Sequence, residues 1–309
     1  MATVTRAPLG GVSRPGTARR ALGLLAGLLL LALALFASVM VGSRTTSFGD
    51  VLDVLSGSAG PRLTDVVESR YPRTALGVLA GTGLAVAGTL MQGVTRNPLA
   101  EPGLLGINAG ASAGIVTGAA FWGAGGGTAG VAAICTAFTQ YVVYAMERDN
   151  ATVLTAYVNG SLTARSWQDA ATIGLVLLVA LPATALLTRR LGIGEMGDDI
   201  ARGLGSDPRN TRTYAVVPAI VLSAGAVGVA GPIAFISLTA PQTAKRLTRV
   251  SGPHLLLSGL TGALLLVLAD LCAQQLPLLE NLPVGIHTMA IGRAYLGFLL
   301  TRERRRGKL

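Results

Sequence analysis

The residue types that carry most enzymatic chemistry are few in this sequence, and their spacing does not suit it. His254 and His287 lie far apart, and Cys135 and Cys272 stand alone in apolar runs. Neither pair has the spacing of a metal site, and two cysteines make no disulfide framework. The phosphate-binding pattern Gly-x-x-x-x-Gly-Lys-Ser/Thr does not occur in the sequence. We therefore expect that the chain is not an enzyme and carries no catalytic residue, metal or cofactor.

Polar residues inside apolar stretches are the next candidates for function. Asp270 is the one acid in the apolar stretch 255–272, where a carboxylate is costly unless it is paired or lines a wet cavity. A functional polar site and a capping or packing role both explain it. Prolines at positions 98, 102, 232 and 241 stand beside glycine or other small residues. This pattern indicates broken helices and closely approaching backbones.

The segment 194–212 is too long and too mixed in charge for a simple turn. Met196, Ile200 and Leu204 recur at every fourth residue, which is typical of one face of a helix. A short helix carrying this apolar stripe could dock into the groove of a partner protein. A solvated connector explains the segment equally well.

Composition identifies the elements that must position these residues. The 309 residues are 51% hydrophobic and only 13% charged, with a mean hydropathy of +0.58 and a net charge of +10. An average soluble domain carries about 25% charged residues. These values exclude a disordered chain, a disulfide scaffold and an ordinary soluble enzyme. Because the charges form short clusters, they also argue against a nucleic-acid partner, and they favour an all-α polytopic helical bundle in a lipid bilayer.

Uncharged or nearly uncharged stretches long enough to cross a bilayer predict the membrane spans. They are residues 21–41, 74–94, 170–188, 255–272 and 284–300. The run 213–244 is too short for two crossings, so we expect one crossing followed by a half-helix that returns after Gly231-Pro232. The run 102–146 is long enough for two more crossings, and we expect nine or ten helical segments in total.

The distribution of arginine and lysine predicts which loops face the cytoplasm. Basic residues exceed acids in residues 1–20, 189–212, 245–249 and 302–308, which are predicted inside. The segments 43–73 and 274–282 lack such an excess and are predicted outside. The expected organisation is a cytoplasmic tail over 1–20, a transmembrane permease domain over 21–301 and a basic cytoplasmic tail over 302–309.

A short internal echo suggests two related halves. Residues 84–88, Leu-Ala-Val-Ala-Gly, resemble residues 227–231, Val-Gly-Val-Ala-Gly, and a proline-bearing segment follows each copy. The predicted topology runs the two copies in opposite directions, as in transporters with a pathway between inverted halves. Two matches of five residues in a chain rich in Ala and Gly also arise by chance.

Ordered motifs across most of residues 44–301 give the chain a family resemblance. In chain order they are Arg70-Tyr-Pro-Arg73, Gly81-x-Gly-Leu-Ala-Val-Ala-Gly88, Gln92, Arg96-Asn-Pro-Leu-Ala-Glu-Pro-Gly-Leu-Leu-Gly106, Ala201-x-x-Leu-Gly205, Gly231-Pro-Ile-Ala-Phe235, Pro241-Gln-x-Ala-Lys-Arg246, Ala269-Asp270 and Leu282-Pro-Val-Gly285. The chain resembles the FecCD-type permeases. These are membrane subunits of ATP-binding-cassette (ABC) importers for ferric siderophores, haem and vitamin B12.

The resemblance implies the type II importer permease fold and a set of partners. They are a second permease, identical or a sister subunit, two cytoplasmic ATPase subunits that bind ATP and Mg, and an extracytoplasmic substrate-binding protein. It implies a multi-pass protein of the bacterial cytoplasmic membrane, with both termini in the cytoplasm, that imports a ferric siderophore or similar metal chelate.

The resemblance also assigns roles to residues. In the segment 194–212, the residues expected to couple transport to the ATPase are Glu195, Asp199, Ala201, Leu204, Gly205, Arg209 and Arg212. Arg70 and Arg73 are expected to dock the binding protein, with simple anchoring of the second span as the alternative. The pathway is expected along Gly88, Gln92, Asn97, Pro98, Gly231, Pro232 and Pro241.

The sequence departs from the family pattern at three places. Gln274 stands where the vitamin B12 permease has another outer arginine, and Arg293 lies in an otherwise uncharged span. After Trp122, the motif spacing predicts that about 35 to 40 residues that would supply a further helix are missing. This gap motivates an alternative, a degenerate FecCD-like subunit that does not transport. The inverted echo and Asp270 motivate a second alternative, an ion-coupled secondary transporter.

Overall fold

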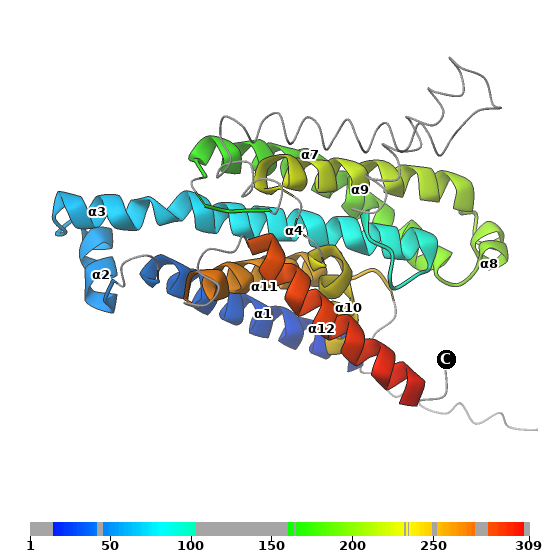
Figure 1. The fold of residues 1–309 in the computed structure, drawn as a ribbon. Coiled ribbons are helices and arrows are strands. Elements are labelled where there is room, and N and C mark those ends of the chain that lie inside the picture. Colours follow the sequence, from blue (N-terminus) through cyan, green and yellow to red (C-terminus); the bar gives the residue numbers. More distant parts are fainter. Residues whose placement is uncertain are drawn as a thin grey trace, which may run out of the picture.

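The computed structural model describes residues 15–41, 46–102, 160–163, 165–231, 233, 235–248, 252–275 and 284–305. Within these ranges every regular element is a helix, which confirms the predicted all-α fold (Figure 1). The helices are α1 (Pro15–Met40), α2 (Phe48–Ser56), α3 (Pro61–Glu68), α4 (Arg70–Thr95), α7 (Trp167–Gly194), α8 (Asp198–Gly203), α9 (Pro208–Ala230), α10 (Ile236–Thr248), α11 (Leu255–Gln275) and α12 (Val284–Arg305).

The described part of the chain contains five stretches that are long and apolar enough to span a membrane. They are Ala21–Met40, Pro61–Thr95, Trp167–Gly194, Pro208–Ala230 and Leu255–Gln275. The spans predicted at 21–41, 74–94, 170–188 and 255–272, and the crossing that begins the run 213–244, fall on them. A total of nine or ten is not confirmed, and the crossings predicted within 102–146 lie almost entirely outside the described residues.

Two regions differ from the span prediction. The predicted span 284–300 is helical in α12, but α12 is not among the five spanning candidates and carries the exposed Arg293. The predicted outer segment 43–73 contains α2 and α3, which apolar patterning did not indicate. Local signals start both helices: Ser47 forms a capping box with Asp50, and Pro61 stands in the first turn of α3.

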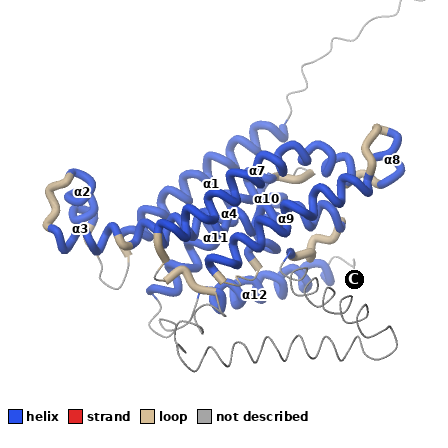
Figure 2. Tube along the Cα trace, turned by 90° about the horizontal axis from the view of Figure 1, so that it is seen from above, coloured by secondary structure: helices blue, strands red, loops and turns tan. Residues whose placement is uncertain are grey.

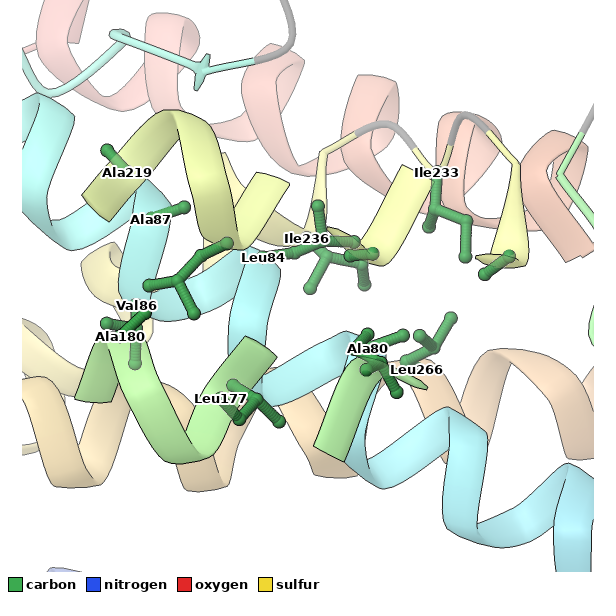
Figure 3. Packing of buried hydrophobic residues seen from close by; sticks show 14 of the residues in the cluster. Ala80, Leu84, Val86, Ala87, Leu177, Ala180, Ala219, Ile233, Ile236 and Leu266 are labelled. Atoms are coloured by element: carbon green, nitrogen blue, oxygen red, sulfur yellow. The ribbon is translucent and has the colours of Figure 1, made fainter. Parts of the chain in front are cut away.

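Helix α4 is the centre of the bundle. It packs against α7, α9, α10 and α11, and its buried residues lie on nearly all of its faces. Leu84, Val86 and Ala87 of α4 lie among Leu177 and Ala180 of α7, Ala219 of α9 and Leu266 of α11 (Figure 3). A helix that is apolar all round is expected where neighbouring helices surround it.

Glycines let the neighbouring backbones approach α4 closely. A Cβ atom on Gly81 would overlap the carbonyl group of Gly262 in α11, and one on Gly88 would overlap the carbonyl group of Ser237 in α10. Small residues at helix crossings are typical of membrane bundles, where close van der Waals packing drives association.

The chain breaks between α9 and α10, as predicted. Gly231 has φ 75° at the end of α9, a conformation that glycine adopts without steric cost, and Phe235 has φ 68° just before α10. Helix α10 then returns toward the end at which α9 begins, because Lys245 in its last turn reaches Glu195. One crossing followed by a returning half-helix is therefore confirmed.

The two copies of the internal echo run in opposite directions. The end of α4 and the start of α9 meet at Asp198, which pairs with Arg96 and with Arg212. Residues 84–88 therefore point toward α8 and residues 227–231 point away from it. Helix α8 lies at one end of the bundle, and α2 and α3 lie at the opposite end (Figures 1 and 2).

Candidate functional site

The predicted apolar stripe of the segment 194–212 faces outward. Helix α8 connects α7 to α9 through short turns, in which Gly197 and Gly205 have φ values of 122° and 73°. Ala201 is buried and seats α8 on the bundle. The three stripe residues, Met196, Ile200 and Leu204, are 62%, 51% and 61% exposed. Because the three stripe residues lie between the spanning stretches Trp167–Gly194 and Pro208–Ala230, this apolar face is suited to a protein partner.

Asp198 fixes α8 to two long helices. Its carboxylate accepts hydrogen bonds from Arg96 at the end of α4 and from Arg212 in α9, the latter at 3.0 and 2.9 Å. Arg96 also donates from Nε to the carbonyl oxygen of Gly194 at 2.9 Å. The hydrogen bond from Arg96, reinforced by the charges of Arg212 and Arg96, holds the pKa of Asp198 below its usual value. Displacement of α8 would therefore act on α4 and α9 together.

A second ion pair ties the same segment to the half-helix. Lys245 Nζ of α10 lies 3.2 Å from Glu195 Oε1, and both side chains are partly exposed. A single exposed pair contributes little to stability, about 0–1 kcal/mol. Its position matters more, because it connects the end of α7 with the end of α10.

The other predicted coupling residues have local roles. Asp199 pairs with Arg202 one turn along α8 at 3.1 Å, and its side chain is fully exposed. Arg209 is exposed, and its backbone N–H donates to Asp207, the N-cap of α9, at 2.9 Å. Asp199 was predicted and Asp198 was not; both acids lie in the first turn of α8, and nothing in the local pattern distinguishes the one that reaches α4 and α9.

Four of the predicted pathway residues are buried between helices. Gly88 and Gln92 of α4 face α10, Gly231 ends α9, and Pro241 lies within α10. Gln92 donates to the carbonyl oxygen of Leu238 at 3.2 Å and accepts from Gln242 Nε2 at 2.7 Å. The structure thus brings the two proline-bearing segments together around Gln92.

The remaining pathway residues lie after α4. Asn97 and Pro98 are exposed, and Asn97 Oδ1 accepts a hydrogen bond from the backbone N–H of Leu99 at 2.9 Å. The carbonyl oxygen of Pro98 accepts from Gln242 Nε2 at 3.4 Å. Pro232 lies outside the described residues.

Glu101 is a residue that the sequence reasoning did not single out. Its Oε1 accepts hydrogen bonds from the backbone N–H of Phe235 at 3.1 Å and from Ser237 Oγ at 2.9 Å. A carboxylate at the start of a helix satisfies donors that lack partners within that helix. Glu101 therefore holds the start of α10, from a position 134 residues earlier in the chain. Pro102, which follows Glu101, indicated an irregular loop. Nothing in the local sequence predicted which groups Glu101 would bind.

The predicted docking arginines have partners within the chain. Arg73 Nε and Nη2 donate to the two carboxylate oxygens of Asp270 at 2.8 and 2.7 Å, and Gln274 donates to Oδ2 at 2.9 Å. The Asp270 side chain is 3% exposed and that of Arg73 is 21% exposed. Arg70 donates to the carbonyl oxygens of Val39 and Met40, the last turn of α1. Asp270 is therefore paired and buried, which is the condition under which an acid is tolerated inside a spanning helix.

No set of three or more His, Cys, Asp and Glu side chains in the described ranges is arranged to hold a metal ion. The predicted absence of a metal and of a cofactor stays a prediction.

Comparison with known proteins places these features in a family. The FecCD transport family matches residues 30–130 and 126–302. The ferric enterobactin transport system permease protein FepG of Escherichia coli (strain K12) is 34% identical, over 86% of this chain and 91% of its own length. FepD, from the same system and organism, is 35% identical over 91% of this chain and 95% of its own. The Fe(3+)-citrate import system permease protein YfmE of Bacillus subtilis (strain 168) is 32% identical over 78% and 83%.

A solved structure shares the fold. It is described as an inward-facing conformation of a metal-chelate type ABC transporter. It superposes with a TM-score of 0.65 at 21% identity, over 91% of this chain and 99% of that chain.

The alignments also bear on the predicted gap. The alignment with FepD runs over 321 positions but covers 91% of the 309 residues, about 281, so about 40 positions of the alignment have no residue of this chain. The same comparison with FepG, 300 positions against about 266 residues, leaves about 34. The family match is divided at residues 126–130, close to Trp122. Both observations support the absence of 35 to 40 residues there. Matched over most of its length by the family and by relatives more than 30% identical, the chain belongs to the FecCD transport family.

Proposed function

We propose that this chain is the membrane permease subunit of an ABC importer that carries a ferric siderophore or a similar metal chelate across the bacterial cytoplasmic membrane. Family membership and the names of its relatives, which include permeases for ferric enterobactin and ferric citrate, support this function. The complex would contain a second permease, two ATPase subunits that bind ATP and Mg, and an extracytoplasmic binding protein. This chain would supply no catalytic group.

The outward-facing stripe of α8 is the observation that carries the proposal. Three apolar side chains stand about half to three-fifths exposed between the spans, so burial of the remainder against a partner would contribute about 1–2 kcal/mol each. Arg189, Arg190, Lys245 and Arg246 lie near the same end of the bundle, which favours a cytoplasmic position for it. An ATPase docked on the stripe would pull on α4 and α9 through Asp198.

The opposite end would face the binding protein, with Arg70 and Arg73 as the docking residues. Because Asp270 already holds Arg73 in a bidentate pair, an acidic residue of the binding protein would have to compete with Asp270. Arg73 is one-fifth exposed, which leaves a limited part of the guanidinium for such a contact. Rim contacts of this kind would steer encounter more than they add affinity.

The translocation pathway would run beside the α4–α10 interface. Gly88, Gln92, Gly231 and Pro241 are buried against neighbouring helices, so they would shape the pathway through packing and not through contact with the cargo. Movement of α10 relative to α4 would be the step that changes access.

Co-purification with the ATPase tests the proposal. Ile200→Asp places a charge in the centre of the stripe and should reduce the ATPase recovered with the tagged chain by about tenfold or more. Leu52→Asp makes a similar change at an exposed position of α2, at the other end of the bundle, and should leave ATPase recovery unchanged. A well-folded wild-type chain that recovers no ATPase would contradict the proposal and favour a degenerate subunit or a secondary transporter.

A further inference from the structure

A groove of about 610 Å³ lies between α7 and the start of α11. Thr82 and Val86 of α4 also line it, together with Leu24 of α1, Thr248 of α10 and His254 just before α11. Most of its lining is leucine, alanine, valine and proline. The volume falls within the range of about 300–1,000 Å³ that is typical of small-molecule sites.

The surroundings of the groove indicate an apolar occupant. Four spanning stretches, those of α1, α4, α7 and α11, contribute to its walls. Leu256 on its wall is 80% exposed, and Leu186, next in sequence to the lining residue Ala185, is 82% exposed. Exposed leucines on spanning helices face lipid, so the groove opens toward the acyl chains of the bilayer.

The charge at the mouth indicates the headgroup. Ala185 and Thr188 of α7 line the groove, and Arg189 is exposed one helical turn after Ala185. At 100° per residue, Arg189 falls within the arc of α7 that lines the groove. Arg190 falls on the other side of α7, where it lines a separate small pocket. The guanidinium of Arg189 can therefore reach the phosphate of a lipid whose chain occupies the groove.

We propose that this groove is a binding site for an anionic phospholipid, with an acyl chain between α7 and α11 and the phosphate beside Arg189. Basic pockets between membrane helices on the cytoplasmic side are a recurrent way of holding acidic headgroups. None of its lining residues belongs to α8 or to the predicted pathway, so the site does not depend on the identity of the transported cargo.

Competition between lipids tests the headgroup assignment. The delipidated, purified full-length chain in detergent is mixed with phosphatidylglycerol and phosphatidylcholine of identical acyl chains, and bound lipid is counted by native mass spectrometry. The wild type should prefer phosphatidylglycerol, and Arg189→Gln should reduce that preference about fivefold, as expected for one arginine near an anionic surface. Arg190→Gln, the matched control, should keep it. Equal retention of both lipids by the wild type, or equal losses in the two variants, would overturn the proposal.

A variant that fills the groove tests the site itself. Ala185→Phe places a ring in the groove and should abolish the bound lipid, whereas Ala183→Phe, at an exposed position of α7 outside the lining, should retain it. Retention by Ala185→Phe would overturn the proposal. With Ala185→p-benzoylphenylalanine, photo-crosslinking in native membranes should yield a phospholipid adduct. A crosslink to a peptide from residues 103–159, or to a second copy of the chain, would identify a protein occupant and contradict the lipid assignment.

Discussion

Arg73 of α4 and Asp270 of α11 form a bidentate ion pair across 197 residues of sequence. The pair lies at the end of the bundle opposite α8 and joins the central helix to its partner in the Gly81–Gly262 crossing. Arg73, which the family resemblance predicts as a docking residue, is thus also part of the packing between α4 and α11. If Arg73 docks the binding protein as proposed, docking and packing would depend on the same guanidinium.

The two halves of this pair should not be equivalent. Arg73→Met leaves the nearly fully buried Asp270 carboxylate without its cation, whereas Asp270→Leu leaves an arginine that can still reach water. Removing one partner of a buried pair lowers the free energy of unfolding by up to about 3–5 kcal/mol. The loss should be smaller for Asp270→Leu, because water can solvate the partly exposed Arg73. Thermal unfolding of the purified chain should show the larger loss for Arg73→Met. Arg62→Met, at an exposed position of α3, is the control, and equal losses in the two variants would refute the asymmetry.

The glycine crossing predicts a position-specific steric effect. Gly81→Ala places a methyl group against the Gly262 backbone, 2.9 Å from the Cα atom of Ala263, and should destabilise the chain by about 1–3 kcal/mol. Gly83→Ala, in the same helix, meets only ordinary contacts at 3.5 and 3.6 Å and should be neutral or stabilising. Urea or thermal unfolding measures both. A tolerated Gly81→Ala would mean that α4 and α11 are not packed as described.

The turn after α8 depends on backbone conformation. Gly205 has φ 73°, which costs an alanine roughly 1–2 kcal/mol, whereas Gly203 ends α8 with ordinary helical geometry. Gly205→Ala should therefore lower ATP-dependent uptake while the protein remains in the membrane. Gly203→Ala, two residues away, should not. Equal uptake by both variants would show that the geometry of this turn is not needed for coupling.

Asp198 predicts how the α8 anchor responds to pH. Its folded-state pKa lies below the unfolded value, mainly because of the hydrogen bond from Arg96. Its contribution is therefore complete above the unfolded pKa, near 4, and is lost as the pH falls through the lower folded pKa. Hydrogen–deuterium exchange of residues 196–206, corrected for intrinsic rates, should be equal at pH 7 and pH 5. Asp198→Asn should exchange faster at both. Loosening of the wild type between pH 6 and pH 5 would contradict this assignment.

Elements that depend on local pattern were predictable from the sequence. Five spanning stretches, the break near Gly231 and the outward stripe of Met196, Ile200 and Leu204 each follow from apolar periodicity or from breaker residues. The absence of 35 to 40 residues was predictable because successive family motifs lie closer together in this chain than they do in the family. Helices α2 and α3 were missed, although Ser47 and Pro61 gave capping signals for them.

Contacts between distant segments were not predictable in this way. Glu101 holds α10, Asp198 joins α4 to α9, and Asp270 pairs with Arg73, and no periodicity names such partners. The sequence also left open whether Asp270 is functional or structural, because an intramembrane acid satisfies both readings until its partner is known. Which charged side chains meet depends on how the helices pack in three dimensions, and the local sequence pattern does not specify that packing.

Transport by a reconstituted complex tests the central claim most directly. The chain, with the ATPase and the binding protein that co-purify with it, is placed in proteoliposomes, and uptake of a ferric siderophore recognised by that binding protein is measured. We expect uptake that requires ATP hydrolysis and is lost with Ile200→Asp. Uptake that persists without the ATPase, driven by an ion gradient, would contradict the account, as would a stable complex that hydrolyses ATP and moves no chelate.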